Sequence, residues 1–194
     1  VRFGMWDRIL AEEAPPPELV YWRGIWHYAR GMAFTHGGEP AKAGGELAAL
    51  SAIADDPSAT AELIGFSHAG KLLEIARSVL AGEVAAKAGR YPEALGHLEK
   101  GVRLEDSLLY NEPPDWYYPV RQSLGAVLLD AGSAVEAEVV YWQDLEQHKD
   151  NGYALYGLWQ ALKRQGRAAE ADDVELRFRT AWVDADVDLT SSRF

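Results

Sequence analysis

The sequence predicts an all-α fold in which antiparallel helix pairs stack into an α–α superhelix. Two observations lead to this prediction: a short turn motif that occurs four times along the 194 residues, and apolar side chains at helical spacing between the turns. No strand pattern is convincing, and no linker or low-complexity tract divides the chain. We therefore expect one domain over residues 1–194.

The turn motif has the form Gly-x-x-x-x-Ala. It occurs at Gly38–Ala43, Gly89–Ala94, Gly132–Ala137 and Gly166–Ala171. The last two copies are about 34 residues apart, the period of a common two-helix repeat. The earlier copies are further apart, so we expect insertions between repeats.

Each turn glycine is expected to end the first helix of a pair, because a residue without Cβ enters the left-handed conformation at no steric cost. Pro40 and Pro92 stand where the second helix begins, where a missing N–H is tolerated. The motif alanine lets the two helices approach closely. Small residues in the first helices are expected to do the same for the neighbouring pair, at Gly31, Gly82 and Gly125, with Trp159 at the fourth such position.

The motif and the apolar spacing together place the elements in order. The repeats are expected over about residues 22–56, 71–105, 116–149 and 151–183, with an insertion at 57–70 that can hold one short helix and a capping tail at 184–194. A short helix over residues 5–12 precedes them, and Asp115 is expected to be the N-cap of a helix that runs to about Asp130. Phe194 is expected to fold back over the last helix, because the end of a solenoid needs a cap.

The composition limits the functions that such a fold can have. The chain is 48% hydrophobic and 25% charged, as in ordinary globular proteins, and no apolar run approaches the roughly 18 residues of a membrane span. Its formal charge of −11 repels phosphate backbones, so nucleic acid is not an expected partner, and basic segments are weakly favoured. The lack of cysteine excludes disulfides, thiolate metal sites and thiol nucleophiles.

The third turn carries the fullest motif, with Leu124-Gly125 in the first helix and Gly132 to Ala137 in the turn. This pattern resembles the tetratricopeptide repeat family. The signature Trp of the family is absent at Ser78, Arg121 and Leu155, so these would be divergent repeats. The resemblance implies a solenoid whose first helices line a concave groove, and a binding scaffold that needs no cofactor.

Two stretches resemble the C-terminal part of large bacterial tetratricopeptide proteins of unassigned function, namely Glu112 to Gly125 and Asp188 to Phe194. The chain opens with Val1-Arg2-Phe3-Gly4, without an initiator Met or a signal peptide, and is interpreted as part of a longer protein. The cytoplasm is slightly favoured as its location. The sequence predicts no oligomeric state.

The groove positions follow from the spacing of the first helices. They include Tyr28, Met32, His36, Val79, Glu83, Lys87, Gln122, Ala126, Tyr156, Gln160, Lys163 and Arg164. Such a mixture of aromatic, amide and cationic groups can hold a peptide. The alternative is that some of these side chains pack between repeats. The Asn and Lys carboxylate clamp of the family has no counterpart at these positions, so a chaperone-tail adaptor is not expected.

A second candidate site is the aromatic cluster Trp116, Tyr117 and Tyr118. It could border a pocket, with Arg121 one helical turn further on to bind an anion or to pair with Glu112. The interpretation that we favour is that Trp116 anchors the loop to the core while the tyrosines make local hydrogen bonds.

No catalytic motif is present. Gly65 to Ala69 nearly matches the Gly-x-Ser-x-Gly nucleophile elbow, but Ala69 replaces a required glycine, and no strand is expected before it. The five histidines have no metal-ligand spacing. The sequence therefore predicts a protein- or peptide-binding scaffold and no enzyme. The alternatives are a small-molecule or substrate-binding regulatory domain of a longer protein, and self-association through an exposed solenoid end.

Overall fold

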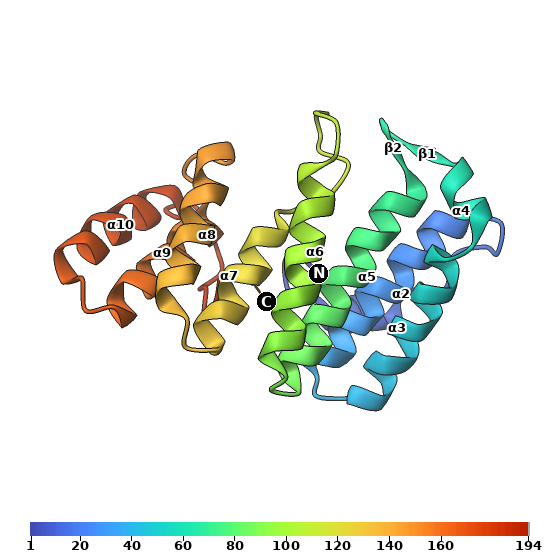
Figure 1. Ribbon diagram of the computed structural model, residues 1–194, viewed down its shortest axis with the longest axis horizontal. Helices are drawn as coiled ribbons and strands as arrows, with labels where there is room; N and C mark the ends of the chain where they lie inside the picture. Colours follow the sequence, from blue (N-terminus) through green and yellow to red (C-terminus); the bar gives the residue numbers. More distant parts are fainter. Residues whose placement is uncertain (194) are drawn as a thin grey trace. The chain divides into compact units, whose positions relative to one another are not determined.

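The computed structural model describes residues 1–193, apart from the side chains of Ser58 and Thr60, and its helices pack in consecutive pairs (Figure 1). This confirms the predicted all-α fold. The chain divides into two compact units, unit 1 (Val1–Tyr118) and unit 2 (Pro119–Phe194). The single domain over 1–194 stays a prediction.

Unit 1 contains two helix pairs, α2/α3 and α5/α6, with a short helix before them and an insertion between them. Its elements are α1 (Trp6–Ala11), α2 (Val20–His36), α3 (Pro40–Ala54), α4 (Pro57–Ala61), β1 (Leu63–Ile64), β2 (Ser67–His68), α5 (Ala69–Lys87) and α6 (Tyr91–Asp106). Helix α5 packs against α2, α3 and α6. It therefore forms the centre of the unit, and it has more buried residues than α2, α3 or α6.

Unit 2 contains two further pairs. Its elements are α7 (Val120–Asp130), α8 (Ala134–Gln147), α9 (Gly152–Arg164) and α10 (Ala168–Ala181). Helix α8 packs against α7 and α9, and α9 packs against α10. None of the helices described over residues 1–193 is both long and apolar enough to span a bilayer.

The four predicted turns have one geometry. Their glycines have φ angles of +73°, +74°, +84° and +73° at Gly38, Gly89, Gly132 and Gly166. At the second turn the Arg90 N–H donates to the Ala85 oxygen and the Gly89 N–H donates to the Ala86 oxygen, both at 2.9 Å. The same pair of bonds recurs at the other three turns and closes each first helix with a Schellman motif. The predicted role of these glycines is confirmed.

The helix glycines also lie at close contacts. A Cβ on Gly31 would be 2.4 Å from Leu80 Cδ2, which places Gly31 between α2 and the neighbouring first helix, α5. A Cβ on Gly82 would be 2.6 Å from Leu98 Cγ, and a Cβ on Gly125 would be 2.4 Å from Tyr141 Cζ. Gly82 and Gly125 therefore admit side chains of their own partner helices, although contacts with the neighbouring pair were predicted for them. The motif alanines, Ala43, Ala94, Ala137 and Ala171, are all buried.

The prediction that Asp115 is the N-cap of the helix ending near Asp130 is wrong. Helix α7 begins at Val120 after Pro119, and Asp115 does not cap it. The residue before a proline is disfavoured in the α conformation, so the chain cannot be helical through Tyr118. Asp115 instead accepts hydrogen bonds from the Phe66 N–H at 3.2 Å and from Asn111 Nδ2 at 2.7 Å. Although desolvation opposes it, these hydrogen bonds lower the pKa of Asp115.

The insertion holds a small hairpin, which the sequence analysis did not expect. Strands β1 and β2 pair antiparallel, with Leu63 opposite His68 and Ile64 opposite Ser67. Gly65, with φ +62°, takes the first position of the two-residue turn. A Cβ there would be 2.0 Å from Asp115 Oδ1, so the turn packs directly on the loop before α7. Ser67 lies in β2 of this hairpin and not in a nucleophile elbow.

Candidate functional site

Aromatic residues of the chain itself cover the predicted groove position Tyr28. Its side chain is 1% exposed, and its hydroxyl lies 3.2 Å from the Tyr118 hydroxyl and accepts a hydrogen bond from Tyr117 at 3.3 Å. The Trp116 ring packs edge-on against Tyr28 with the centroids 5.7 Å apart and is itself buried. Burial raises the pKa of Tyr28 well above its usual value. Tyr28 and Trp116 therefore belong to the core and line no groove.

Helix α1 contacts α2 beside this cluster. The His36 ring, which was predicted to face the groove, stacks on Trp6 with the centroids 5.0 Å apart. Arg30 Nη1 donates to the Leu10 oxygen at 3.3 Å, and Trp26 Nε1 donates to the Glu12 oxygen at 3.1 Å. The segment before α2 thus occupies much of the α2 surface that the sequence left open.

Gln122 is fully buried in unit 2 and ties three helices together. Its Nε2 donates to Asp144 Oδ2 of α8 and to the side-chain oxygen of Asn151, the N-cap of α9, both at 3.1 Å. Burial raises the pKa of Asp144, while Gln122 and the charges of His148 and Arg121 oppose the change. Gln122 is therefore a core residue. Arg121 is partly exposed, and its positive charge lies near enough to Asp144 to lower the pKa of that carboxyl.

The predicted groove residues of α9 lie around an aromatic stack. Tyr156 contacts Trp159 and Phe178 with centroid distances of 5.6 and 5.4 Å, and Lys163 Nζ lies 4.6 Å from the Trp159 ring centroid. Arg164 donates to the Leu129 oxygen and joins α9 to the end of α7. These contacts stabilise the last pair, although Lys163 stays exposed.

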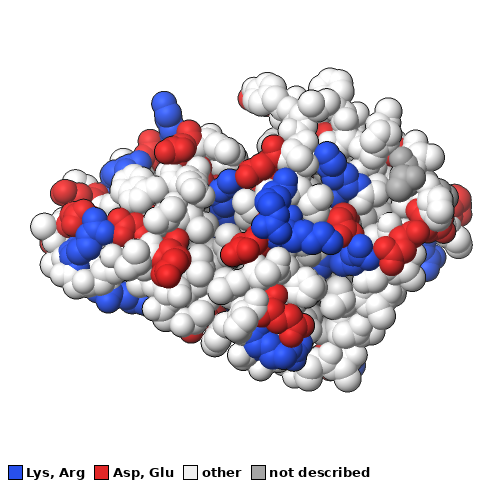
Figure 2. All heavy atoms as spheres, in the orientation of Figure 1, with Lys and Arg blue, Asp and Glu red and all other residues white. Residues whose placement is uncertain are grey.

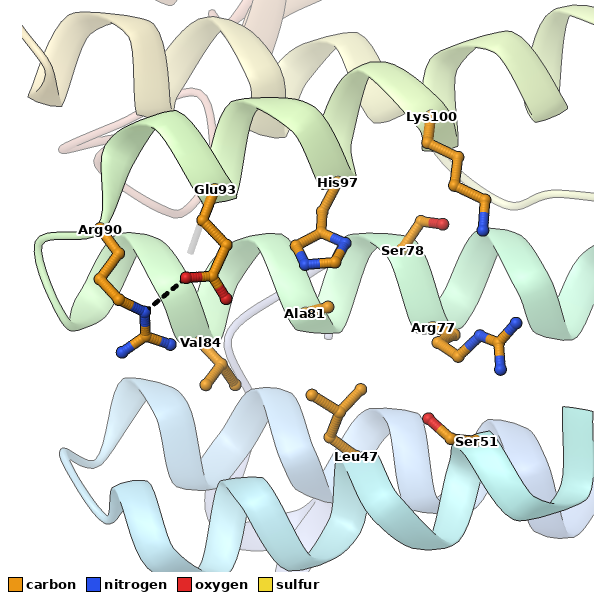
Figure 3. A pocket seen from close by; sticks show the side chains of 10 residues that line it. All are labelled: Leu47, Ser51, Arg77, Ser78, Ala81, Val84, Arg90, Glu93, His97 and Lys100. Carbon is orange, nitrogen blue, oxygen red and sulfur yellow. Dashed lines mark hydrogen bonds and ion pairs between the residues drawn. The ribbon is translucent and has the colours of Figure 1, made fainter.

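An open hollow lies on another side of unit 1, between the two second helices. Helices α3 and α6 form its walls and α5 its floor (Figure 3). Its volume is about 370 Å³, and it is lined by Leu47, Ser51, Arg77, Ser78, Ala81, Val84, Arg90, Glu93, His97 and Lys100. In Figure 3, His97 and Lys100 point from α6 toward Leu47 and Ser51 of α3, across α5.

A second hollow of about 460 Å³ continues the first toward the turns. It shares Val84 and Arg90 with the first hollow and adds Thr35, Gly38, Glu39, Pro40, Ala43, Lys87 and Ala88. We call the two together the α3–α6 groove. Lys87 is the predicted site residue that the structure places in this groove.

Charged side chains line the rims of the α3–α6 groove. Arg77 donates to Asp55 Oδ1 at 2.7 Å, and both Arg77 and Lys100 contact Glu74. Arg90 and Glu93 pair at 2.7 Å along α6. Within residues 1–193, Lys87 has no carboxylate at ion-pair distance. Figure 2 shows basic side chains gathered over this part of unit 1, with acidic ones between them.

Unit 2 has a comparable hollow between α8 and α10, of about 430 Å³. Trp142, Leu145, Glu146, Lys149, Asp150 and Arg177 line it. Arg177 donates to Asp150 at 3.0 Å, and its guanidinium lies 5.9 Å from the Trp142 ring centroid. The second helices therefore border open hollows in both units. The site residues predicted from the sequence lie on the first helices and in the aromatic cluster, and they include neither Arg77 of α5 nor His97 and Lys100 of α6.

The arrangement of the helices has a counterpart among solved structures. It is similar to the crystal structure of the Podosopora anserina putative kinesin light chain nearly identical TPR-like repeats, with a TM-score of 0.58, and the match covers 94% of this chain and 86% of that chain. The chain has a TPR-like repeat fold. At 16% sequence identity the likeness shows the fold alone. No protein-family model and no curated protein matches the sequence.

Stacked helical repeats create extended surfaces on which other molecules can bind. In this chain, the first-helix positions Tyr28 and Gln122 are buried, whereas the α3–α6 groove is open and polar at its rims. The α3–α6 groove is therefore the candidate functional site.

Proposed function

We propose that the protein is a binding scaffold that holds an acidic peptide segment of a partner protein in the α3–α6 groove. The observation that carries this proposal is the composition of the groove in a chain with a formal charge of −11: its lining contains four Lys or Arg side chains and two carboxylates, and Asp55 and Glu74 pair with Arg77 and Lys100 at the rim. The groove is thus less negative than the chain as a whole. The charge of the whole chain by itself would favour a basic partner.

The physical basis of binding would be exchange of ion pairs at the rim and burial of apolar atoms at the floor. Arg77 and Lys100 now pair with Asp55 and Glu74 at the protein surface, and such pairs are each worth only about 0–1 kcal/mol. A carboxylate of the peptide can therefore replace them at small cost. Leu47 on the α3 wall and Val84 on the α5 floor offer an apolar surface for one or two side chains of the peptide.

The test is a set of 12-residue peptides of acidic, neutral and basic composition, followed by titration of the tightest binder by fluorescence anisotropy. We expect acidic peptides to bind and basic ones not to bind. Lys87→Glu and Lys100→Glu, at the two ends of the groove, should each weaken binding by about fivefold at low salt.

Arg103→Glu is the matched control, because Arg103 lies on the same helix as Lys100, is exposed and does not line the groove. It should leave the affinity close to that of the wild type. Equal losses of affinity in all three variants would mean that the peptide responds only to the net charge of the protein and not to the groove. A preference for basic peptides, or tight binding of a small organic acid with no peptide bound, would contradict the proposal.

A further inference from the structure

The tail after α10 returns to the first helix of unit 2. Trp182 Nε1 donates to the Val187 oxygen at 2.7 Å and fixes the turn that follows α10. Beyond it, Leu189 and Ser192 are buried, although residues 183–188 are largely exposed. Phe194 lies outside the described residues, and its fold-back over the last helix stays a prediction. The described part of the tail reaches α7 instead.

Three groups of α7 and α8 hold the end of this tail. The Ser192 hydroxyl donates to the Gln122 main-chain oxygen at 2.8 Å and lies 2.7 Å from the Tyr141 hydroxyl. Since a serine has one hydroxyl proton, Tyr141 is the donor to Ser192. Arg193 Nη2 donates to Asp130 Oδ2 at 2.6 Å. Three separate polar contacts therefore bind Ser192 and the arginine that follows it.

The site is built into the helices. A Cβ on Gly125 of α7 or on Gly157 of α9 would lie 2.4 or 2.1 Å from Tyr141 Cζ, so the ring passes through a slot between two glycines to reach Ser192. Burial raises the pKa of the Tyr141 hydroxyl and lowers that of Arg193 to about 10. Both groups are thus largely removed from water, where a missing partner is costly.

We infer that the surface formed by the Gln122 oxygen, the Tyr141 hydroxyl and the Asp130 carboxylate is a second peptide-recognition site. Its ligand is a segment with the pattern Leu-x-x-Ser-Arg, and residues 189–193 occupy it in cis. The tail has neither helix nor strand over residues 184–193, and the residues that lead to the bound segment are largely exposed. The tail can therefore dissociate without unfolding the helix pairs of unit 2. A segment from another protein would then compete with a tail at an effective concentration in the millimolar range.

This inference is independent of the α3–α6 groove and has its own test. The probe is a fluorescent peptide with the sequence of residues 184–194, added to the full wild-type chain and to the full-length double variant Ser192→Ala, Arg193→Ala. The peptide should bind the double variant at least tenfold more tightly than the wild type, because the cis tail no longer competes. The same peptide with both alanine changes should not bind, and Asp130→Asn added to the double variant should weaken binding.

Two outcomes would overturn the inference: no binding to a folded double variant, which makes the tail a fixed structural clamp, or equal binding to both proteins, which places the peptide elsewhere. If the double variant does not fold, hydrogen exchange of the wild type decides the question. Amides of residues 186–193 that exchange well before those of α7 and α9 support a displaceable tail. Tail amides that exchange only on global unfolding contradict it.

Discussion

At the scale of single residues, the sequence indicates which side chains are special but not what lies against them. Helical spacing placed Tyr28 on the groove face of its helix. In the structure, Trp116 and Tyr118, which are distant in the sequence, cover its side chain. Gln122 was predicted to face a groove, yet its amide meets Asp144 and Asn151 in the core. Such contacts depend on the path of loops, for which the apolar spacing within a helix carries no information.

The buried Tyr28 hydroxyl gives a prediction for alkaline pH. Because the pKa of Tyr28 is raised on folding, its contribution to stability is present below about pH 10 and is lost as the pH rises, since only the unfolded phenol ionises there. Each such tyrosine adds at most about 1.4 kcal/mol per pH unit to the loss. Tyr28→Phe should therefore lose stability less steeply than the wild type between pH 10 and 11.

Urea unfolding followed by circular dichroism measures this difference in slope. The same two proteins at pH 8 are the control, because the phenol is protonated in both the folded and the unfolded state there. Parallel losses above pH 10 would mean that Tyr28 ionises freely in the folded protein, which its burial does not permit.

At the scale of elements, most boundaries were predictable because each has a local cause. The turn glycines mark the ends of the first helices, Pro40 and Pro92 mark the starts of α3 and α6, and the structure places helix ends within a few residues of the expected positions. Two elements were not predictable in this way. Two-residue strands are too short to show an alternating pattern, and the start of α7 depends on Pro119, whose effect on Tyr118 outweighs the capping propensity of Asp115.

Alanine substitutions at two glycines of the second pair distinguish the effect of turn geometry from that of helix propensity. Gly89 has φ +74°, so Gly89→Ala should lower the free energy of unfolding by about 1 kcal/mol. Gly96 lies inside α6, where an added Cβ would have no atom within 4 Å. Gly96→Ala should raise the free energy of unfolding by about 0.5–1 kcal/mol. Chemical denaturation of both variants gives the two signs, and equal effects would refute the assignment of Gly89 to a left-handed turn.

At the scale of the whole molecule, the sequence predicted a repeat fold and a binding role but placed the candidate sites on the first helices and in the aromatic cluster. Two segments outside the helix pairs cover part of the first helices. The aromatic cluster covers α2 in unit 1, and the returning tail covers α7 in unit 2. The open surface lies between the second helices, where Arg77, His97 and Lys100 come from positions without any recognisable motif. Only the packing of α3 and α6 on α5 brings them together.

The central claim is that the α3–α6 groove of unit 1 binds the partner while Tyr28 remains covered by the chain itself. Amide chemical-shift mapping with the tightest acidic peptide tests this claim most directly. We predict shifts along α3, α5 and α6, centred on Leu47, Ser78, His97 and Lys100, with α2 around Tyr28 and residues 186–193 unchanged. Shifts confined to α2 around Tyr28 and to the aromatic cluster would contradict it and would return the binding site to the first helices.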